Sequence, residues 1–213
     1  MDSQILTVPN PGISKSMTSI SNDVDLLRQH ILGVSERMAR VVLIVVSGLP
    51  GTGKSYFSRR MAERVPLAIV ETDAMRNVLF PSPTHSGTES ARLFKACHAL
   101  IEDLLRKGIP VLLDATNLVE HNRERLYNIA YKTNAKLIIV RVEAPLDVVS
   151  ERLRKREESD GHEDNSTADL AVYRRMVSSV EPIRRNHFAL DTSKDITPVV
   201  DKIAREMDRW IRI

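Results

Sequence analysis

The sequence contains a single cysteine, Cys97, among its 213 residues, so no disulfide can form within one chain. A lone cysteine also excludes a metal cluster built from cysteines, and both absences are typical of proteins in a reducing compartment. No apolar run approaches the roughly 20 residues that a membrane-spanning helix needs. The first residues, MDSQILTVPNPG, lack the basic stretch followed by an apolar core that marks a secretory signal. We therefore expect a cytoplasmic protein that does not associate with a membrane.

Aromatic residues and net charge are also scarce. Phe, Trp and Tyr make up 4% of the chain, and 31 basic against 28 acidic residues leave a formal charge of +3. A charge this small permits an anionic partner without requiring one, because an extended nucleic-acid surface usually needs clustered basic residues. The length fits one domain, with or without an appendage.

Short apolar runs alternate with helical segments from residue 40 onward. Strands buried on both faces are predicted at 41–46, 67–70, 111–113, 137–142 and 187–190. Amphipathic helices are predicted at about 54–65, 89–107, 119–133, 145–157, 169–180 and 195–212. Such alternation favours right-handed βαβ units and an α/β fold whose parallel sheet is covered by helices on both sides.

The first 39 residues differ from the rest. Residues 1–20 mix Ser, Thr, Pro, Gly and Asn without periodicity, which predicts a flexible tail. Residues 21–39 open on Ser-Asn-Asp, a good helix cap, and space their apolar residues as an amphipathic helix does. This helix either packs on the domain formed by residues 40–213 or contacts another protein chain.

The stretch SGLPGTGKS, residues 47–55, follows the first apolar run and matches the phosphate-binding pattern G-x-x-x-x-G-K-S. Its glycines let the backbone turn so that N–H groups point at phosphate oxygens, and the helix that begins at Lys54 adds the positive end of its dipole. Lys54 is expected to neutralise the β- and γ-phosphates, and Ser55 to coordinate Mg²⁺. The expected nucleotide contacts here are Gly48, Leu49, Pro50, Gly51, Thr52, Gly53, Lys54, Ser55 and Tyr56.

Two carboxylates follow neighbouring strands. Parallel strands end at the same edge of a sheet, so Asp73 and Asp114 should both reach the bound phosphates. Asp73 fits a base that takes the proton of an attacking hydroxyl, and Arg76, one helical turn later, fits an anchor for an anionic group of the acceptor. Asp114 fits the orientation of Mg²⁺ through Ser55. The alternative for either carboxylate is a helix cap.

Signatures of other nucleotide-hydrolysing classes are missing. A switch GTPase reads guanine with N-K-x-D, which the residues NAK at 134–136 do not match. Motor ATPases usually place a glutamate after the second aspartate, whereas Ala115 follows Asp114. Phosphoryl transfer to a bound acceptor is the remaining interpretation.

Transfer to an acceptor requires a lid that excludes water. The segment ERLRKR, residues 151–156, places Arg152 and Arg156 on one helix face, directly before the polar stretch 157–167. We expect a lid over about residues 151–176.

With these motifs the chain resembles the small P-loop kinases that include 5′-polynucleotide kinase domains, seryl-tRNA kinases and zeta-type toxin kinases, together with AAA_33-type ATP-binding proteins. The resemblance covers residues 41–195 and is carried by GLPGTGKSYF (48–57), D-x-x-R at Asp73 and Arg76, GIPVLLDATN (108–117) with Arg123 shortly after, and the lid helix. It implies a general base at Asp73, an acceptor-phosphate contact at Arg76 and ATP contacts from Arg152 and Arg156. It also implies that adenine lies between the lid helix and the turn that contains Thr192.

The prediction is therefore a three-layer P-loop kinase fold with a five-stranded parallel sheet in the order 2-3-1-4-5. It should use ATP and Mg²⁺ to phosphorylate a hydroxyl of a polynucleotide 5′ end or of a small polar molecule, with Lys54, Asp73, Arg76 and Arg152 as catalytic residues. The alternatives are a regulatory ATPase that acts through a protein partner and a toxin-type kinase that acts on a sugar nucleotide.

Three further residues have simple interpretations. Phe80 and His85 are the candidates for stacking on a terminal base, although Phe80 is more simply a core residue and His85 a solvated loop residue. Cys97 is expected to be a small buried apolar residue.

Overall fold

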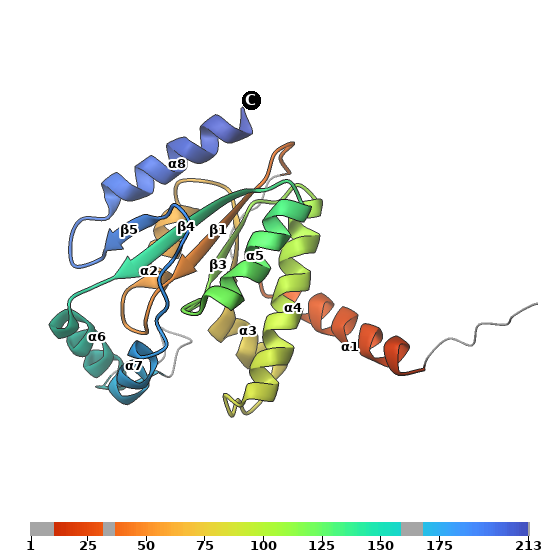
Figure 1. Ribbon diagram of the computed structural model, residues 1–213, viewed down its shortest axis with the longest axis horizontal. Helices are drawn as coiled ribbons and strands as arrows, with labels where there is room; N and C mark the ends of the chain where they lie inside the picture. The colour runs from red at the N-terminus through yellow and green to blue at the C-terminus, as the bar shows by residue number, and fades with distance from the viewer. Residues whose placement is uncertain (1–10, 32–36, 159–167, 213) are drawn as a thin grey trace, which may run out of the picture.

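The computed structural model describes residues 11–31, 37–158 and 168–212, and within these ranges a five-stranded parallel sheet forms the centre (Figure 1). Its strands are β1 Val42–Ser47, β2 Ala68–Glu71, β3 Val111–Asp114, β4 Lys136–Glu143 and β5 Phe188–Asp191. They lie in the order β2-β3-β1-β4-β5, and every adjacent pair is parallel. The predicted order of strands is confirmed.

Eight helices accompany the sheet in the described ranges. They are α1 Pro11–Arg28, α2 Lys54–Ala62, α3 Thr72–Leu79, α4 Gly87–Arg106, α5 Glu120–Lys132, α6 Leu146–Glu158, α7 Leu170–Val177 and α8 Thr197–Ile211. None of these described helices combines the length and the apolar character needed to cross a membrane.

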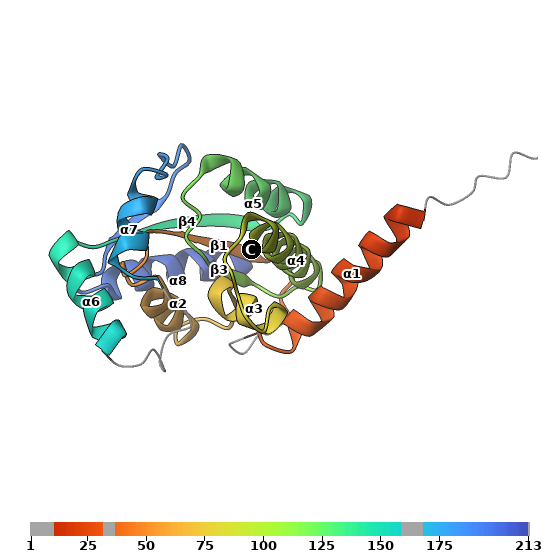
Figure 2. The same cartoon turned by 90° about the horizontal axis from the view of Figure 1, so that it is seen from below.

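The alternation of side chains along β1 builds two separate cores. Leu43 and Val45 point to one face and pack with residues of α1, α3, α4 and α5. Val42, Ile44 and Val46 point to the other face and pack with α2 and α8. Because successive side chains of a strand point to opposite faces, a strand that is apolar at every position must be covered on both sides. Figure 2 shows this three-layer arrangement edge-on.

Helix α1 differs most from its predicted bounds. It begins at Pro11 rather than residue 21 and ends at Arg28, so half of the expected tail is helical. The predicted tail also includes residues 1–10 and the predicted helix also includes residues 32–36, and both of these ranges lie outside the described residues. The last turns of the helix pack on the domain, with Val24 and Leu27 buried and Arg92 donating two hydrogen bonds to Asp23 at 2.6 and 2.8 Å. The other end leads away from the domain in both views (Figures 1 and 2).

Helix α3 was absent from the helices predicted by periodicity. Its eight residues, TDAMRNVL, form little more than two turns and give only Met75 and Leu79 to the core. A pattern this short contains too few apolar residues to establish a period of 3.6. The lid prediction corresponds to α6 and α7, and residues 159–167 between them lie outside the described residues.

Two neighbouring residues of α4, the buried Cys97 and the half-buried His98, have no visible chemical role. Burial raises the pKa of the Cys97 thiol to about 12, so the thiol stays protonated and behaves as the expected apolar residue. Burial and the nearby Arg125 lower the pKa of His98 to about 4.

This histidine makes the stability of the domain sensitive to acid. The unfolded chain binds a proton at His98 near pH 6.5, whereas the folded chain does so only near pH 4, so stability is lost as the pH falls through this window. The unfolding free energy of the unchanged protein falls between pH 7 and pH 5. We expect this fall to be about 1–2 kcal/mol smaller in His98→Leu. Urea unfolding at both pH values measures this difference. His121→Leu, at an exposed histidine of α5, is the control, and an equal effect in both variants would contradict the assignment.

Candidate active site

One cavity of about 1150 Å³ lies at the carboxyl ends of the strands. The loops after β1, β3 and β5 line it, together with residues of α2, α3, α4, α6 and α7. Small-molecule sites usually measure about 300–1,000 Å³, so this cavity has room for more than one small ligand. Its position at the carboxyl edge is the one that the parallel topology predicts.

The loop between β1 and α2 forms the floor of the cavity. Gly51 and Gly53 have φ angles of +76° and +89°, which side chains other than hydrogen rarely permit. A Cβ on Gly48 would lie 2.4 Å from the carbonyl oxygen of Val142, so no larger residue fits there. Lys54 donates from Nζ to the carbonyl oxygen of Leu49 at 3.1 Å, which holds the ammonium group over the loop. The geometry is that of a backbone cradle for phosphate.

Arg152 lies against this cradle. Its Nη1 donates to Thr192 Oγ1 at 2.8 Å and to the Gly51 carbonyl at 3.4 Å, and its Nη2 donates to the Thr192 carbonyl at 2.9 Å. Thr192 in turn donates from Oγ1 to the Thr52 carbonyl at 2.6 Å. The structure therefore brings Arg152 and Thr192 together beside the loop, as expected for residues around a nucleotide. Arg156 lines the same cavity from α6.

Asp114 is buried, with 4% of its surface exposed, at the end of β3. Burial raises the pKa of its carboxyl group, and this effect is opposed by Lys54 and by hydrogen bonds from Ser55 and Ser58. Ser58 donates to Oδ2 at 3.0 Å. The residue that precedes α5 at its cap is Val119, so Asp114 is not a helix cap.

These residues fit the site of Mg²⁺. Among the described residues no cluster of three or more His, Cys, Asp or Glu side chains is placed to hold a metal alone. Mg²⁺ bound with a nucleotide typically takes one or two protein oxygens, substrate phosphates and waters. One buried carboxylate that is hydrogen-bonded to Ser55 is consistent with that arrangement.

Asp73 and Arg76 stand on the first turns of α3, on the other side of the cavity. The cap position of α3 is Glu71, so Asp73 is not a helix cap either. Arg76 is 8% exposed, and its Nη2 donates to Ser90 Oγ at 3.3 Å. Its Nε and Nη1 are buried and have no hydrogen-bond partner among the described residues.

Glu89 is the acidic residue nearest to Arg76, at 3.6 Å from Nη1. Its carboxylate, however, accepts hydrogen bonds from the backbone N and the hydroxyl of Thr84 at 2.9–3.0 Å. These bonds lower the pKa of Glu89 and hold it toward the loop before α4. The guanidinium group of Arg76 therefore keeps unused donors at the wall of the cavity.

The cavity wall includes three apolar side chains that the sequence did not identify, Phe94 from α4 and Val172 and Met176 from α7. Tyr56, predicted as a nucleotide contact, is half exposed and also lines the cavity. His85 also lines the cavity, in a left-handed conformation with φ of +54°. Phe80 packs against the core and under the guanidinium group of Arg92 instead, as its simpler interpretation predicted.

The cavity is strongly basic. Eight cationic side chains line it against three carboxylates, Glu71, Asp73 and Asp114. The cationic residues are Lys54, Arg59, Arg76, Arg152, Lys155, Arg156, Arg175 and Lys194. The formal charge of +3 for the whole chain hides this concentration of charge.

Comparison with known proteins places these features in a family context. Residues 43–183 match the family described as an AAA domain, designated AAA_33. L-seryl-tRNA(Sec) kinase of Methanococcus maripaludis is 33% identical over 116 residues, which are 52% of this chain and 44% of that kinase. The chain spans less than half the length of the curated relatives it matches.

Solved structures share the fold at low sequence identity. Kti12 of Chaetomium thermophilum, in complex with ADP-AlF3, is 20% identical with a TM-score of 0.62, over 79% of this chain and 98% of that protein. The APS kinase CysC of Mycobacterium tuberculosis, in complex with AMPPNP and APS, is 17% identical with a TM-score of 0.58, over 82% of this chain and 99% of that chain. Likeness at this level supports the fold.

The buried carboxylate of Asp114 supplies a test of the metal site. Asp114→Asn removes a charge that burial disfavours, so the unfolding midpoint should stay equal or rise. The gain in ATP affinity on adding Mg²⁺ should fall about tenfold, because a ligand-orienting carboxylate is lost. Calorimetric titration of ATP with and without Mg²⁺ measures this gain.

Asp147→Asn, in the first turn of α6, is the matched control and should keep the full effect of Mg²⁺. If Asp114→Asn also kept the full effect, Asp114 would have no part in binding the metal.

Proposed function

We propose that this chain, which belongs to the AAA domain family and is a P-loop kinase-like protein, transfers the γ-phosphate of ATP to a hydroxyl group of a bound acceptor. We further propose that the acceptor carries an anionic group, such as the phosphate of a polynucleotide end or of a small phosphorylated molecule. The cavity is the site of both ligands in this proposal.

The buried, unsatisfied guanidinium of Arg76 is the observation that carries the proposal. A buried donor without a partner costs about 1–3 kcal/mol, and more when it is charged. Such a group persists where a ligand supplies the missing acceptor, and the planar fork of arginine matches phosphate oxygens. Glu89 does not supply it, since Thr84 holds that carboxylate.

The remaining residues fit the steps of a direct transfer. The loop at 48–55 holds the phosphates of ATP, and Lys54 neutralises their charge. Mg²⁺, held by Ser55 and Asp114, would balance the charge on the phosphate oxygens. Asp73 takes the proton of the acceptor hydroxyl. The hydroxyl oxygen then bonds to the γ-phosphorus, while the bond between the γ-phosphorus and the bridging oxygen breaks and ADP leaves. Arg152, on the lid helix α6, stabilises the negative charge on the transferring group.

Two features favour an acceptor that resembles a nucleotide. The cavity wall presents Phe94 and Met176, which suit the flat face of a base. The relative from Methanococcus maripaludis is named as a kinase of a seryl group on tRNA, which is a hydroxyl attached to a nucleic acid. A phosphorylated metabolite is the other member of the same chemical class.

A regulatory ATPase that acts through a protein partner is the second candidate. Helix α1, one end of which leads away from the domain, is the feature that favours it (Figure 2). This candidate predicts ATP hydrolysis that does not depend on any acceptor.

The first test follows the γ-phosphate. Labelled ATP is incubated with 5′-hydroxyl oligonucleotides, nucleoside 3′-monophosphates and uncharged polyols, and transfer is measured to each. Asp73→Asn should lower transfer to the best acceptor by about 10²–10⁴-fold and leave the Kd for ATP within about twofold, because the base acts only on the hydroxyl. Asp147→Asn should behave as the unchanged protein. Normal transfer by Asp73→Asn would remove this mechanism, and hydrolysis independent of any acceptor would favour the regulatory ATPase.

The second test separates the function of Arg76 from its effect on stability. Arg76→Met should raise the KM of an anionic acceptor by about 10–100-fold, because a charged hydrogen bond is lost. The same variant should stay within about 1–3 kcal/mol of the unchanged protein in free energy of unfolding, because loss of the 3.6 Å ion pair with Glu89 opposes the gain from removing two unsatisfied donors. Thermal unfolding and steady-state kinetics measure the two effects. A destabilised variant with an unchanged KM would show that Arg76 serves the fold alone.

A further inference from the structure

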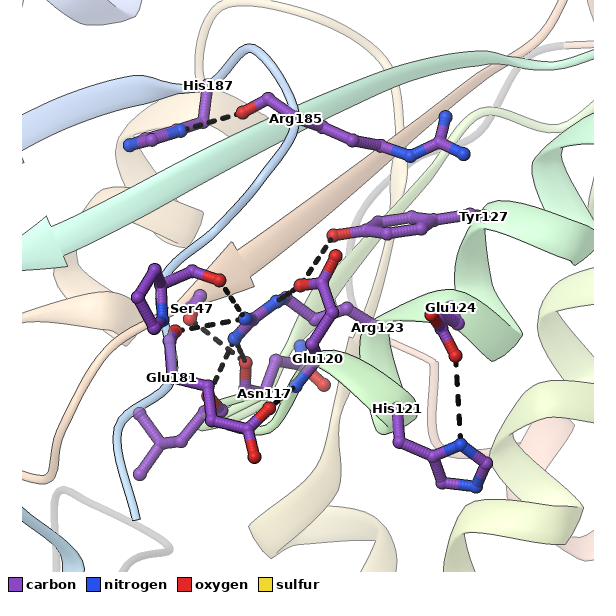
Figure 3. A network of polar contacts seen from close by, with 12 residues as sticks. Ser47, Asn117, Glu120, His121, Arg123, Glu124, Tyr127, Glu181, Arg185 and His187 are labelled. Atoms are coloured by element: carbon purple, nitrogen blue, oxygen red, sulfur yellow. Dashed lines mark hydrogen bonds and ion pairs between the residues drawn. The ribbon is translucent and has the colours of Figure 1, made fainter. Parts of the chain in front are cut away.

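Arg123 on α5 is a completely buried cation outside the cavity, with 0% of its surface exposed (Figure 3). Its Nε donates to Glu120 Oε2 at 2.8 Å. Its other two nitrogens donate at 2.7–3.0 Å to four backbone carbonyl oxygens, those of Asn117, Leu118, Glu181 and Pro182. Every nitrogen of the guanidinium group therefore has a partner, and only one partner is acidic.

The four carbonyls belong to two segments that are distant in sequence. Asn117 and Leu118 follow β3, whereas Glu181 and Pro182 lie between α7 and β5. The segments also contact each other directly, because the backbone N of Glu181 donates to the Leu118 carbonyl at 3.0 Å and the backbone N of Glu120 donates to the Glu181 carboxylate at 2.7 Å. We call residues 117–123 with 181–182 the Arg123 joint.

The joint extends to the start of the phosphate loop. Asn117 adopts a left-handed conformation, with φ of +44°, and donates from Nδ2 to the Val46 carbonyl at 2.7 Å. Ser47 donates from Oγ to the Asn117 carbonyl at 3.1 Å, and the backbone N of Gly48 donates to the Thr116 carbonyl at 3.0 Å. The loop that Arg123 holds is thus fixed to the last residues of β1.

On its other side the joint fixes the chain that leaves α7. This helix contributes Val172, Arg175 and Met176 to the cavity wall. Beyond the joint, the guanidinium group of Arg185 lies over the ring of Tyr127 at 4.4 Å, which adds a second contact between this chain and α5. The end of α7 is thereby fixed to the same helix as the loop after β3.

An apolar residue would fill the space of Arg123 at a lower cost in desolvation. The planar guanidinium group has five N–H donors and binds four carbonyls of the two segments together with Glu120, whereas the ammonium group of lysine has three donors. We therefore explain the arginine at this position by its ability to hold the two segments together, and not by its contribution to core packing.

We propose that Arg123 is a positioning residue, which sets the acceptor wall of α7 at a fixed place relative to the phosphate loop. The inference rests on the proposed function, because it takes the cavity wall formed by α7 as part of the site that binds the acceptor.

Hydrogen exchange read by mass spectrometry tests the joint without any acceptor. The variants are Arg123→Lys, which keeps the charge but not the planar fork, and Glu181→Ala, which removes an exposed carboxylate and spares the bonds of Arg123. We expect exchange across residues 170–186 to accelerate about tenfold in both, with peptides of β1 and β3 unchanged, because local opening involves only the released segment. Arg125→Gln, an exposed arginine on the same helix, is the matched control.

Kinetics supplies the second readout. Arg123→Lys should raise the KM of the acceptor about tenfold and leave the Kd for ATP within about twofold, because only the acceptor wall is released. Equal acceleration of exchange in β1, β3 and α7 would overturn the proposal, since Arg123 would then serve global stability alone. Unchanged exchange over 170–186 in both variants would overturn it as well.

The two readouts separate this inference from the proposed function. If no acceptor is phosphorylated while residues 170–186 are released selectively, the joint stands and the kinase mechanism fails. If Arg123→Lys does not fold, Glu120→Gln, which removes the charge of the acidic partner of Arg123 and keeps the shape of the side chain, decides the result by exchange.

Discussion

The glycines of the phosphate loop are packed so closely that β4, α6 and the turn after β5 lie in direct contact with the loop backbone. A Cβ on Gly48 would meet β4, one on Gly51 would lie 3.0 Å from Leu153 and Val149 of α6, and one on Gly53 would lie 3.0 Å from Thr192. Contacts this short mean that the sheet, the lid helix and the turn after β5 all rest directly on the loop backbone. The rest of the site depends on this packing, because a phosphate held by backbone N–H groups can only be met by residues whose elements touch the same loop.

The distribution of charge around the cavity also shapes the site. Eight cationic side chains and three carboxylates surround one cavity, and two of the carboxylates have different environments. Asp114 is buried and hydrogen-bonded by serines, whereas Asp73 stands on the first turn of a helix beside Arg76. Two carboxylates in such different surroundings suit different tasks, one toward a metal and one toward a proton. The unsatisfied donors of Arg76 make the far side of the cavity attractive to a second anion.

The sequence predicts most of the fold because short, nearly continuous apolar runs alternate with helical segments, which favours a parallel sheet, and because the ends of parallel strands converge on one edge. Asp73 and Asp114 were predicted by the argument from strand ends, Arg152 from the requirement for a basic lid helix, and Thr192 from the resemblance to P-loop kinases. Helix α3 was missed because eight residues carry too little periodic signal. Phe94 and Met176 were missed because spacing along a helix cannot tell a cavity wall from the core. The contacts of Arg123 depend on Glu181 and Pro182, 58 and 59 residues away, which no local pattern connects.

A ligand that occupies both halves of the cavity tests the central claim most directly. In adenosine joined by five phosphates to the 5′ oxygen of a nucleoside 3′-monophosphate, one molecule would span the donor loop and place an acceptor phosphate at Arg76. The account predicts that one ligand binds per chain. Its Kd should be at least about tenfold lower than that of ADP, because the acceptor half binds without a further loss of translational and rotational freedom. Arg76→Met should remove that advantage. Binding no tighter than ADP, and equal in both proteins, would show that the cavity does not hold donor and acceptor together.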